Sequence, residues 1–155
     1  MSSPGRLTGA LLAAAVVAGV ATEPAAAKVT FSGIDGVRLD MSQSAVTETL
    51  GQPSNTEDFR GSEAIRLTYR RHKLAVIVHR DEDRVVGVTT TARGERTSSG
   101  LGVGSSAGVV RAKLRGEKCG TAQDVLVCTV ERSGRVLDFE IRRGKVFRVS
   151  LSDLG

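Results

Sequence analysis

The feature that most constrains this chain is a segment that occurs twice. A shift of 64 positions, without a gap, aligns residues 37–50 with residues 101–114. The aligned apolar and serine pairs are Val37 with Leu101, Leu39 with Val103, Ser42 with Ser106, Val46 with Val110 and Leu50 with Leu114. Since self-similarity at a fixed offset is the sequence sign of a repeated unit, we predict two copies of one small motif.

Each copy predicts a short helix that begins after a serine. Ser42 and Ser106 are suitable N-cap residues, because a serine hydroxyl accepts a hydrogen bond from a backbone N–H of the first turn. The helices are expected over residues 43–50 and about 107–114, each with two apolar residues four positions apart on its buried side. Gly51 and Pro53 end the first helix.

Strand-like segments follow each helix. Residues 65–70 alternate apolar with polar, which is the period of a half-buried strand. We predict strands at 65–70, 74–80 and 85–91 in the first copy, and at 125–130, 136–142 and 146–151 in the second. In the second copy, alternation assigns Leu137, Phe139 and Ile141, and likewise Phe147, Val149 and Leu151, to the packed face. The polar residues 54–63 are expected to form a loop.

These elements predict an α+β fold. We expect a signal peptide at 1–27, a first helix-plus-meander repeat at 28–91, a linker at 92–100 and a second repeat at 101–155. Each repeat consists of a short helix and a three-stranded antiparallel meander. The two meanders are expected to form one continuous sheet with both helices on one face.

The first 27 residues indicate export. Arg6 precedes an apolar stretch at 7–21, and the alanines at 25–27 provide a cleavage site of the kind that signal peptidase recognises. A retained transmembrane anchor is the alternative, although the stretch is shorter than the roughly 20 residues of a membrane span. After cleavage no remaining run is long enough to cross a membrane, and we expect a secreted monomer.

The charge balance is moderately basic. The chain has 22 Lys and Arg against 17 Asp and Glu, a formal net charge of +5, and the signal contributes nothing because Arg6 and Glu23 cancel. Such a balance permits weak attraction to anionic surfaces. The two signs are interleaved and aromatic residues are few, so we predict no nucleic-acid partner.

The two cysteines, Cys119 and Cys128, predict a disulfide, since exported proteins oxidise paired thiols. Closing a loop of about ten residues would stabilise the fold by about 2.7 kcal/mol on the chain-entropy estimate. Two alternatives remain for these cysteines: they could provide half of the ligands of a metal site, or they could form a redox-active pair. Both histidines, His72 and His79, lie in the other copy, and the spacing is not C-x-x-C.

No motif in the sequence predicts catalysis. Nucleophile, zinc-protease, P-loop and EF-hand patterns are missing, so we expect no enzyme activity, no catalytic residues, no metal and no cofactor. The acidic run at 81–83 is better explained as a charged turn than as a cation site. The glycines at 100–104 are better explained by a linker and close packing than by phosphate binding.

The duplicated pattern resembles the β-lactamase-inhibitor-protein-like and SmpA/OmlA superfamily. The residues that carry this resemblance are Val37, Leu39, Met41, Ser42, Val46, residues 50–53, residues 67–69 and residues 85–89, with weaker counterparts at 101–114 and 126–151. The resemblance implies two helix-plus-sheet units with an open, concave sheet face, and a function in protein binding. Two departures matter: this chain has few aromatic residues for such a face, and no cysteine near the cleavage site for lipidation.

We therefore predict a secreted, non-catalytic module that binds an extracellular or envelope protein through the open sheet face. The expected architecture of this module is inhibitor-like. The expected partner-binding residues are Arg66, Thr68, Arg70, Asp138, Glu140, Arg142 and Arg148. Ordinary solvent exposure explains the same alternation without any partner. The alternative function is an envelope-associated structural protein held on anionic polymers by its positive charge, and a small hydrolase is the third.

Overall fold

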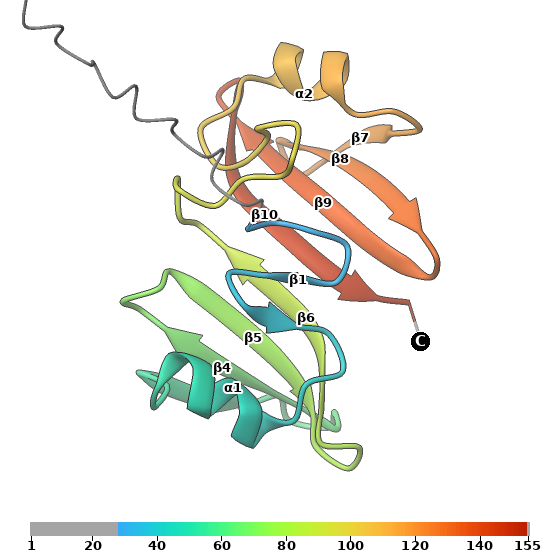
Figure 1. Ribbon diagram of the computed structural model, residues 1–155. Coiled ribbons are helices and arrows are strands. Elements are labelled where there is room, and N and C mark those ends of the chain that lie inside the picture. Colours follow the sequence, from blue (N-terminus) through green and yellow to red (C-terminus); the bar gives the residue numbers. More distant parts are fainter. Residues whose placement is uncertain (1–27, 155) are drawn as a thin grey trace, which may run out of the picture.

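The computed structural model describes residues 28–154, and the predicted signal peptide lies outside this range. Within it the chain forms two short helices and ten strands (Figure 1). In chain order these are β1 (Gly33–Ile34), β2 (Val37–Arg38), α1 (Gln43–Leu50), β3 (Asn55–Asp58), β4 (Ala64–Tyr69), β5 (Leu74–His79), β6 (Arg84–Thr90), α2 (Ala107–Lys113), β7 (Lys118–Ala122), β8 (Val125–Arg132), β9 (Arg135–Arg142) and β10 (Lys145–Asp153).

Eight of the strands form one antiparallel sheet in the order β3-β4-β5-β6-β10-β9-β8-β7, and β1 and β2 form a separate two-stranded sheet. The two central strands are β6 and β10, which pair from Gly87 with Ser152 to Thr90 with Val149. Tight two-residue turns at 123–124, 133–134 and 143–144 join β7 through β10, and all six of these residues have a positive φ. Such turns match the twist of the strands that they connect.

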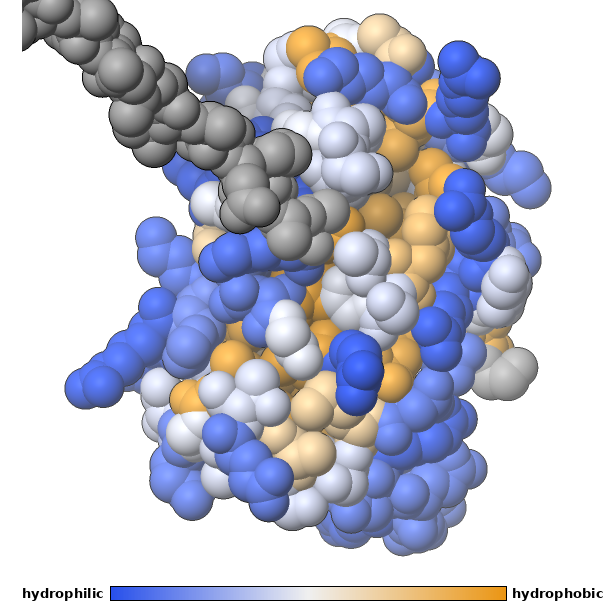
Figure 2. Space-filling model, in the orientation of Figure 1, coloured by the Kyte–Doolittle hydropathy of each residue, from blue (hydrophilic) through white to orange (hydrophobic). Residues whose placement is uncertain are grey.

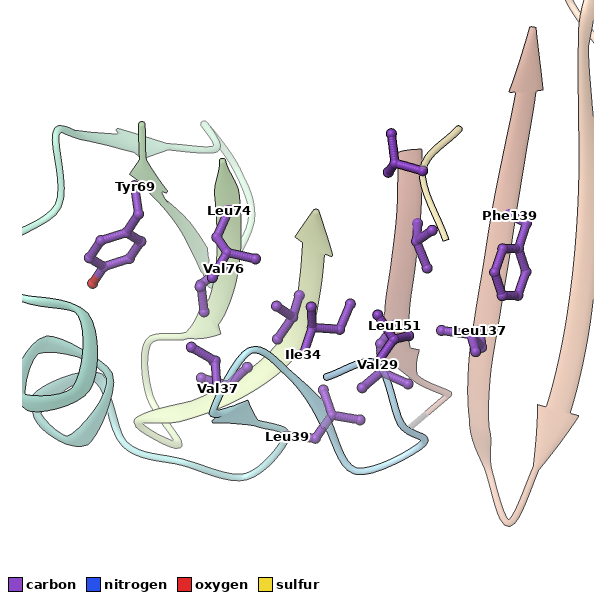
Figure 3. Packing of buried hydrophobic residues seen from close by; sticks show 14 of the residues in the cluster. Val29, Ile34, Val37, Leu39, Tyr69, Leu74, Val76, Leu137, Phe139 and Leu151 are labelled. Atoms are coloured by element: carbon purple, nitrogen blue, oxygen red, sulfur yellow. The ribbon is translucent and has the colours of Figure 1, made fainter. Parts of the chain in front are cut away.

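One face of the large sheet is covered. In Figure 1 the helices α1 and α2 and the β1–β2 hairpin all lie on the same side of it. Ile34, Val37 and Leu39 of the N-terminal segment are buried and point toward the sheet, where they pack near Val76 and Leu151 (Figure 3). Burial of this apolar surface is the main stabilising contribution to the fold.

The prediction of an α+β fold with two tandem helix-plus-meander repeats is wrong. The protein is mostly β, its two helices comprise only eight and seven residues, and the large sheet has eight strands instead of the six expected. A separate two-stranded sheet, which was not predicted, covers part of the large one.

The two missed strands of the large sheet are its edges, β3 and β7. Every residue in both strands is exposed, so neither carries the apolar alternation by which a strand is recognised. Asn55–Asp58 was predicted as part of a loop because of its polar composition. Polar and charged residues are what natural edge strands use to discourage pairing with other chains, and this explains why composition misled the prediction.

Both predicted helix N-caps are confirmed. The hydroxyl of Ser42 accepts a hydrogen bond from the backbone N–H of Ala45 at 3.2 Å, and that of Ser106 from Val109 at 3.3 Å. The first helix ends at Gly51, which has a φ of 81° and donates its N–H to the carbonyl of Thr47. Val46 and Val110 are the buried residues of the two helices.

The predicted disulfide is also confirmed. Cys119 and Cys128 are bonded, and they are direct cross-strand partners on β7 and β8. The bridge therefore fastens the edge strand β7 to the rest of the sheet. No helix in residues 28–154 is long and apolar enough to cross a bilayer.

Candidate functional site

The sheet face opposite α1 and α2, here called the open face, is not covered by any other element among residues 28–154 (Figure 1). Residues that pair directly across antiparallel strands point to the same face. The register therefore defines one row across the open face: Asn55, Thr68, Ala75, Thr89, Ser150, Asp138, Thr129 and Lys118. The row is rich in small hydroxyl side chains, which leave the sheet surface accessible.

The structure distributes the seven predicted partner-binding residues over this face. Arg66 and Thr68 lie on β4 and Arg70 directly follows it, whereas Asp138, Glu140 and Arg142 lie on β9 and Arg148 on β10. Thr68 and Asp138 belong to the same row but are four strand spacings apart, about 19 Å. The predicted residues therefore share a face without forming a single cluster.

Four cationic residues surround a hollow on the open face, here called the basic hollow. It has a volume of about 280 Å³. Its lining consists of Arg66, Thr68, Tyr69, Arg70, Lys73, Leu74, Ala75, Thr89, Thr91 and Arg148, with no acidic side chain. Lys73, Thr89 and Thr91 were not predicted as site residues, because they lie at strand ends and in a turn where sequence periodicity gives no signal.

The cations contributed by the first half of the sheet are in no ion pair, although Glu57 is the direct cross-strand partner of Arg66. Within residues 28–154, the side chains of Arg66, Arg70 and Lys73 form no ion pair. The Nε of Arg66 is buried and has no hydrogen-bond partner. Arg70 and Lys73 are exposed, so these two cations are the groups that favour an anionic partner from solvent.

The charged residues of the second half are instead engaged with their own neighbours. Arg148 lies 3.3 Å from the carboxylate of Glu140, and Thr129 donates a hydrogen bond of 2.5 Å to Asp138. Arg142 stacks on the ring of Phe147 at 4.7 Å. These contacts leave the first half of the open face as the part with free charge.

The prediction that Phe147 faces the core is wrong. The pairing of β10 with β9 shifts register between Val146 and Arg148, so the intervening Phe147 has no partner in the ladder. Its ring is half-buried and lies between two guanidinium groups, 4.7 Å from Arg142 and 5.3 Å from Arg148. A bulge breaks the two-residue period, and the ring is thereby placed beside the arginines of the open face.

The two histidines do not meet. His72 precedes β5 and lies 3.9 Å from Asp35, whereas His79 ends β5 and lies 3.2 Å from Glu63. In the described part of the chain, no three His, Cys, Asp or Glu side chains are grouped so as to hold a metal.

Comparison with known proteins yields similarities of fold alone. No family model matches the chain, and no curated protein matches it. Among solved structures, it is similar to an extracellular protein containing a SCP domain from Bacillus anthracis (TM-score 0.56, 11% identity, 74% of this chain and 44% of that chain). It is also similar to a cysteine-rich secretory protein from Staphylococcus aureus (TM-score 0.53, 13% identity, 74% of this chain and 44% of that chain).

The chain thus spans less than half the length of these two proteins. At such low identity the similarity shows a shared fold and does not transfer a function. The resemblance to the β-lactamase-inhibitor-like superfamily stays a prediction.

Proposed function

We propose that this protein is an exported, non-catalytic binding module whose open face binds an acidic segment of an extracellular or envelope protein. The observation that carries this proposal is the basic hollow. Arg66, Arg70 and Lys73 line it and are in no ion pair within residues 28–154, and threonine hydroxyl groups share the lining.

The chemistry of the hollow favours a carboxylate-bearing partner. Arginine side chains bind planar carboxylates with two hydrogen bonds, and the exposed guanidinium of Arg70 is in no ion pair within residues 28–154. A charged face of this kind increases the association rate and specificity more than the affinity. Binding is therefore expected to weaken as salt is added.

Export is supported by two independent observations. The chain contains a disulfide, which persists in oxidising compartments, and its first 27 residues have the composition of a signal peptide. The first of the similar structures is described as an extracellular protein.

The same unpaired cations favour one alternative, retention on an anionic envelope polymer. A polymer would engage exposed cations wherever they lie, whereas a protein partner would depend on the particular cations of the hollow. The two functions therefore differ in how they respond to the position of a charge.

A charge-reversal experiment tests the proposal. The immobilised protein is exposed to culture fluid, and captured material is measured at low and at high salt. Replacement of Arg66, Arg70 and Lys73 by Glu is expected to abolish capture of a saturable protein partner. Because surface charges contribute little to stability, the free energy of unfolding is expected to change by less than about 1 kcal/mol.

The matched control replaces three exposed arginines away from the open face, Arg38, Arg93 and Arg111, by Glu. This variant carries the same net charge and is expected to keep its partner. The envelope-polymer function would replace the proposed one if two results were found together. The unmodified protein would capture an anionic polymer instead of a protein, and both triple variants would lose that capture to the same extent.

A further inference from the structure

A second hollow lies on the covered side, and it shares no lining residue with the basic hollow. This groove, here called the α2 groove, has a volume of about 800 Å³. Its lining consists of residues 29–32, residues 97–99, residues 113–115, Val130, Arg132, Ser133, Arg135 and Leu137. Figure 2 shows apolar surface, in orange, between α2 at the top and the N-terminal segment at the centre.

The groove exists because β8 and β9 extend beyond the helix that covers them. Each has eight residues, whereas β4 and β5 in the other half have six. Val130 and Leu137 pair near the turn of the β8–β9 hairpin, two residue pairs beyond the buried pair of Cys128 and Phe139. α2 ends at Lys113, so Val130 remains half-buried and forms the groove floor.

The walls of the groove are held by specific contacts. Arg135 donates a hydrogen bond of 3.2 Å to the carbonyl of Phe31 and one of 3.0 Å to Asp40. Lys113 donates to the carbonyl of Ser99 at 2.9 Å, and this joins the end of α2 to the opposite wall. The hollow is therefore pre-formed, as small-molecule sites usually are.

The groove combines an apolar interior with an entirely cationic set of ionisable residues. Its apolar lining is contributed by Val29, Phe31, Leu114, Val130 and Leu137. All four ionisable lining residues are basic (Lys113, Arg115, Arg132 and Arg135), although the chain contains 17 acidic residues. A ligand that complements both properties has an apolar body and an anionic head.

The cations differ in their availability. Arg135 and Lys113 hold the walls, and Arg132 lies over the ring of Phe31 at 5.0 Å. Arg115 is exposed and forms no ion pair or hydrogen bond through its side chain within residues 28–154. It directly follows Leu114, so a charged head at Arg115 would leave the apolar body next to the groove floor.

We propose that the α2 groove binds a small anionic amphiphile, a carboxylate or sulfate that carries an alkyl or aryl body. The body lies over Val130 and Leu137, and the head pairs with Arg115 and Arg132. This site is separate from the open face, and it does not depend on the function proposed for that face.

The test uses two soluble probes with the same alkyl body and opposite head charge, decanoate and decyltrimethylammonium, below their micelle-forming concentrations. Binding is followed by backbone amide chemical shifts in the intact protein. Decanoate is expected to bind saturably and to shift the amides of Leu114, Val130 and Leu137. Decyltrimethylammonium is expected to bind more weakly, because its head would be repelled by the groove cations.

Substitution of the arginines expected to pair with the anionic head tests whether their charge contributes to binding. Arg115→Glu and Arg132→Glu are each expected to weaken decanoate binding about fivefold, the size of effect that one exposed charge provides. Arg93→Glu is the matched control, since Arg93 is exposed and lies outside the groove lining, and it is expected to bind like the unmodified protein.

Three outcomes would overturn the proposal. The first is equal affinity for the two probes, which would show that head charge is irrelevant. The second is an equal effect of Arg115→Glu and Arg93→Glu. The third is a set of shifts confined to the open face, which would assign decanoate binding to the basic hollow.

Discussion

Glu95 is a buried carboxylic acid whose charge is affected by the fold. Only 4% of it is exposed, and one of its carboxylate oxygens is buried without a hydrogen-bond partner. Burial raises the pKa of Glu95 above its ordinary value of 4.5, and a hydrogen bond with Thr90 offsets this only in part. Asp35 and Lys28 are its charged neighbours, and His72 lies beside Asp35.

A raised carboxyl pKa means that the folded state keeps its proton longer than the unfolded state does. The stability linked to Glu95 is therefore fully present below pH 4.5 and is lost as the pH rises through its folded-state pKa. We expect Glu95→Gln to match the unmodified protein near pH 4 and to become more stable than it toward neutral pH. Urea unfolding across this range measures the difference.

Glu82 provides a control of the opposite sign. A hydrogen bond from Arg84 lowers the pKa of Glu82, so its contribution to stability is present at neutral pH and is lost on acidification. Glu82→Gln is expected to be less stable than the unmodified protein at neutral pH and equal to it at acid pH. A Glu95→Gln profile parallel to that of Glu82→Gln would contradict the assignment of Glu95.

Phe147 shows where prediction at the level of single residues stops. Alternation correctly assigns Leu137, Phe139 and Ile141 to the core, where all three are buried. It fails at Phe147, because a one-residue bulge depends on cross-strand register that no local pattern records. The arginines of the open face were predictable from alternation, whereas their association into a hollow was not.

At the scale of elements, Gly102, in the segment before α2, and Gly87, in β6, differ in whether the structure has room for a Cβ atom. A Cβ on Gly102 would lie 2.4 Å from the carbonyl oxygen of Glu95, so the backbone there approaches closer than any side chain permits. A Cβ on Gly87 in β6 would meet Ile77 at 3.5 Å, an ordinary contact. The expectation of close packing for the glycine-rich segment is therefore confirmed at Gly102.

This contrast predicts two different alanine substitutions. Gly102→Ala is expected to reduce the free energy of unfolding by about 1 to 3 kcal/mol, since two segments must separate to admit the methyl group. Gly87→Ala, the matched control, is expected to change it by less than about 0.5 kcal/mol. Chemical denaturation of both variants measures this, and equal effects would contradict the close approach at Gly102.

The helices and the six inner strands were predictable because caps and apolar periodicity are local signals. The edge strands β3 and β7 were not, since they bury nothing and pair on one side only. The β1–β2 hairpin was likewise missed, because strands of two residues are too short to show a period. These missed elements changed the fold class from the predicted one.

At the scale of the whole molecule, the two halves of the sheet are joined through β6 and β10. Thr89 donates a hydrogen bond of 3.2 Å to Ser150 across this junction. Asp40 of the N-terminal segment pairs with Arg84 of β6 at 3.4 Å and with Arg135 of β9 at 3.0 Å. These connections favour unfolding as a single cooperative unit.

The disulfide and the single tyrosine provide a test of this cooperativity. Tyr69 lies on β4 in one half, and the Cys119–Cys128 bridge lies at the far edge of the other. Replacing both cysteines by Ala is expected to destabilise the protein by about 2 to 3 kcal/mol. The Tyr69 fluorescence transition should shift by as much as the transition measured by circular dichroism.

The control for that experiment is reductant, which should destabilise the unmodified protein and leave the double alanine variant unaffected. A Tyr69 transition that stays in place while circular dichroism shows two steps would mean that the halves unfold separately.

The N-terminal segment described above has a practical consequence for any fusion or tether. Lys28 hydrogen-bonds through its backbone N–H to Arg96 on the covered side, and Val29 forms part of the α2 groove. Cargo joined upstream of Lys28 would crowd the α2 groove while the open face remains unobstructed. Immobilisation through the amino end thus suits partner capture. Ligand titrations call for the untagged protein, because the carboxyl end is also close to the groove: the backbone N–H of Leu154 donates to the carbonyl of Gly134, between the lining residues Ser133 and Arg135.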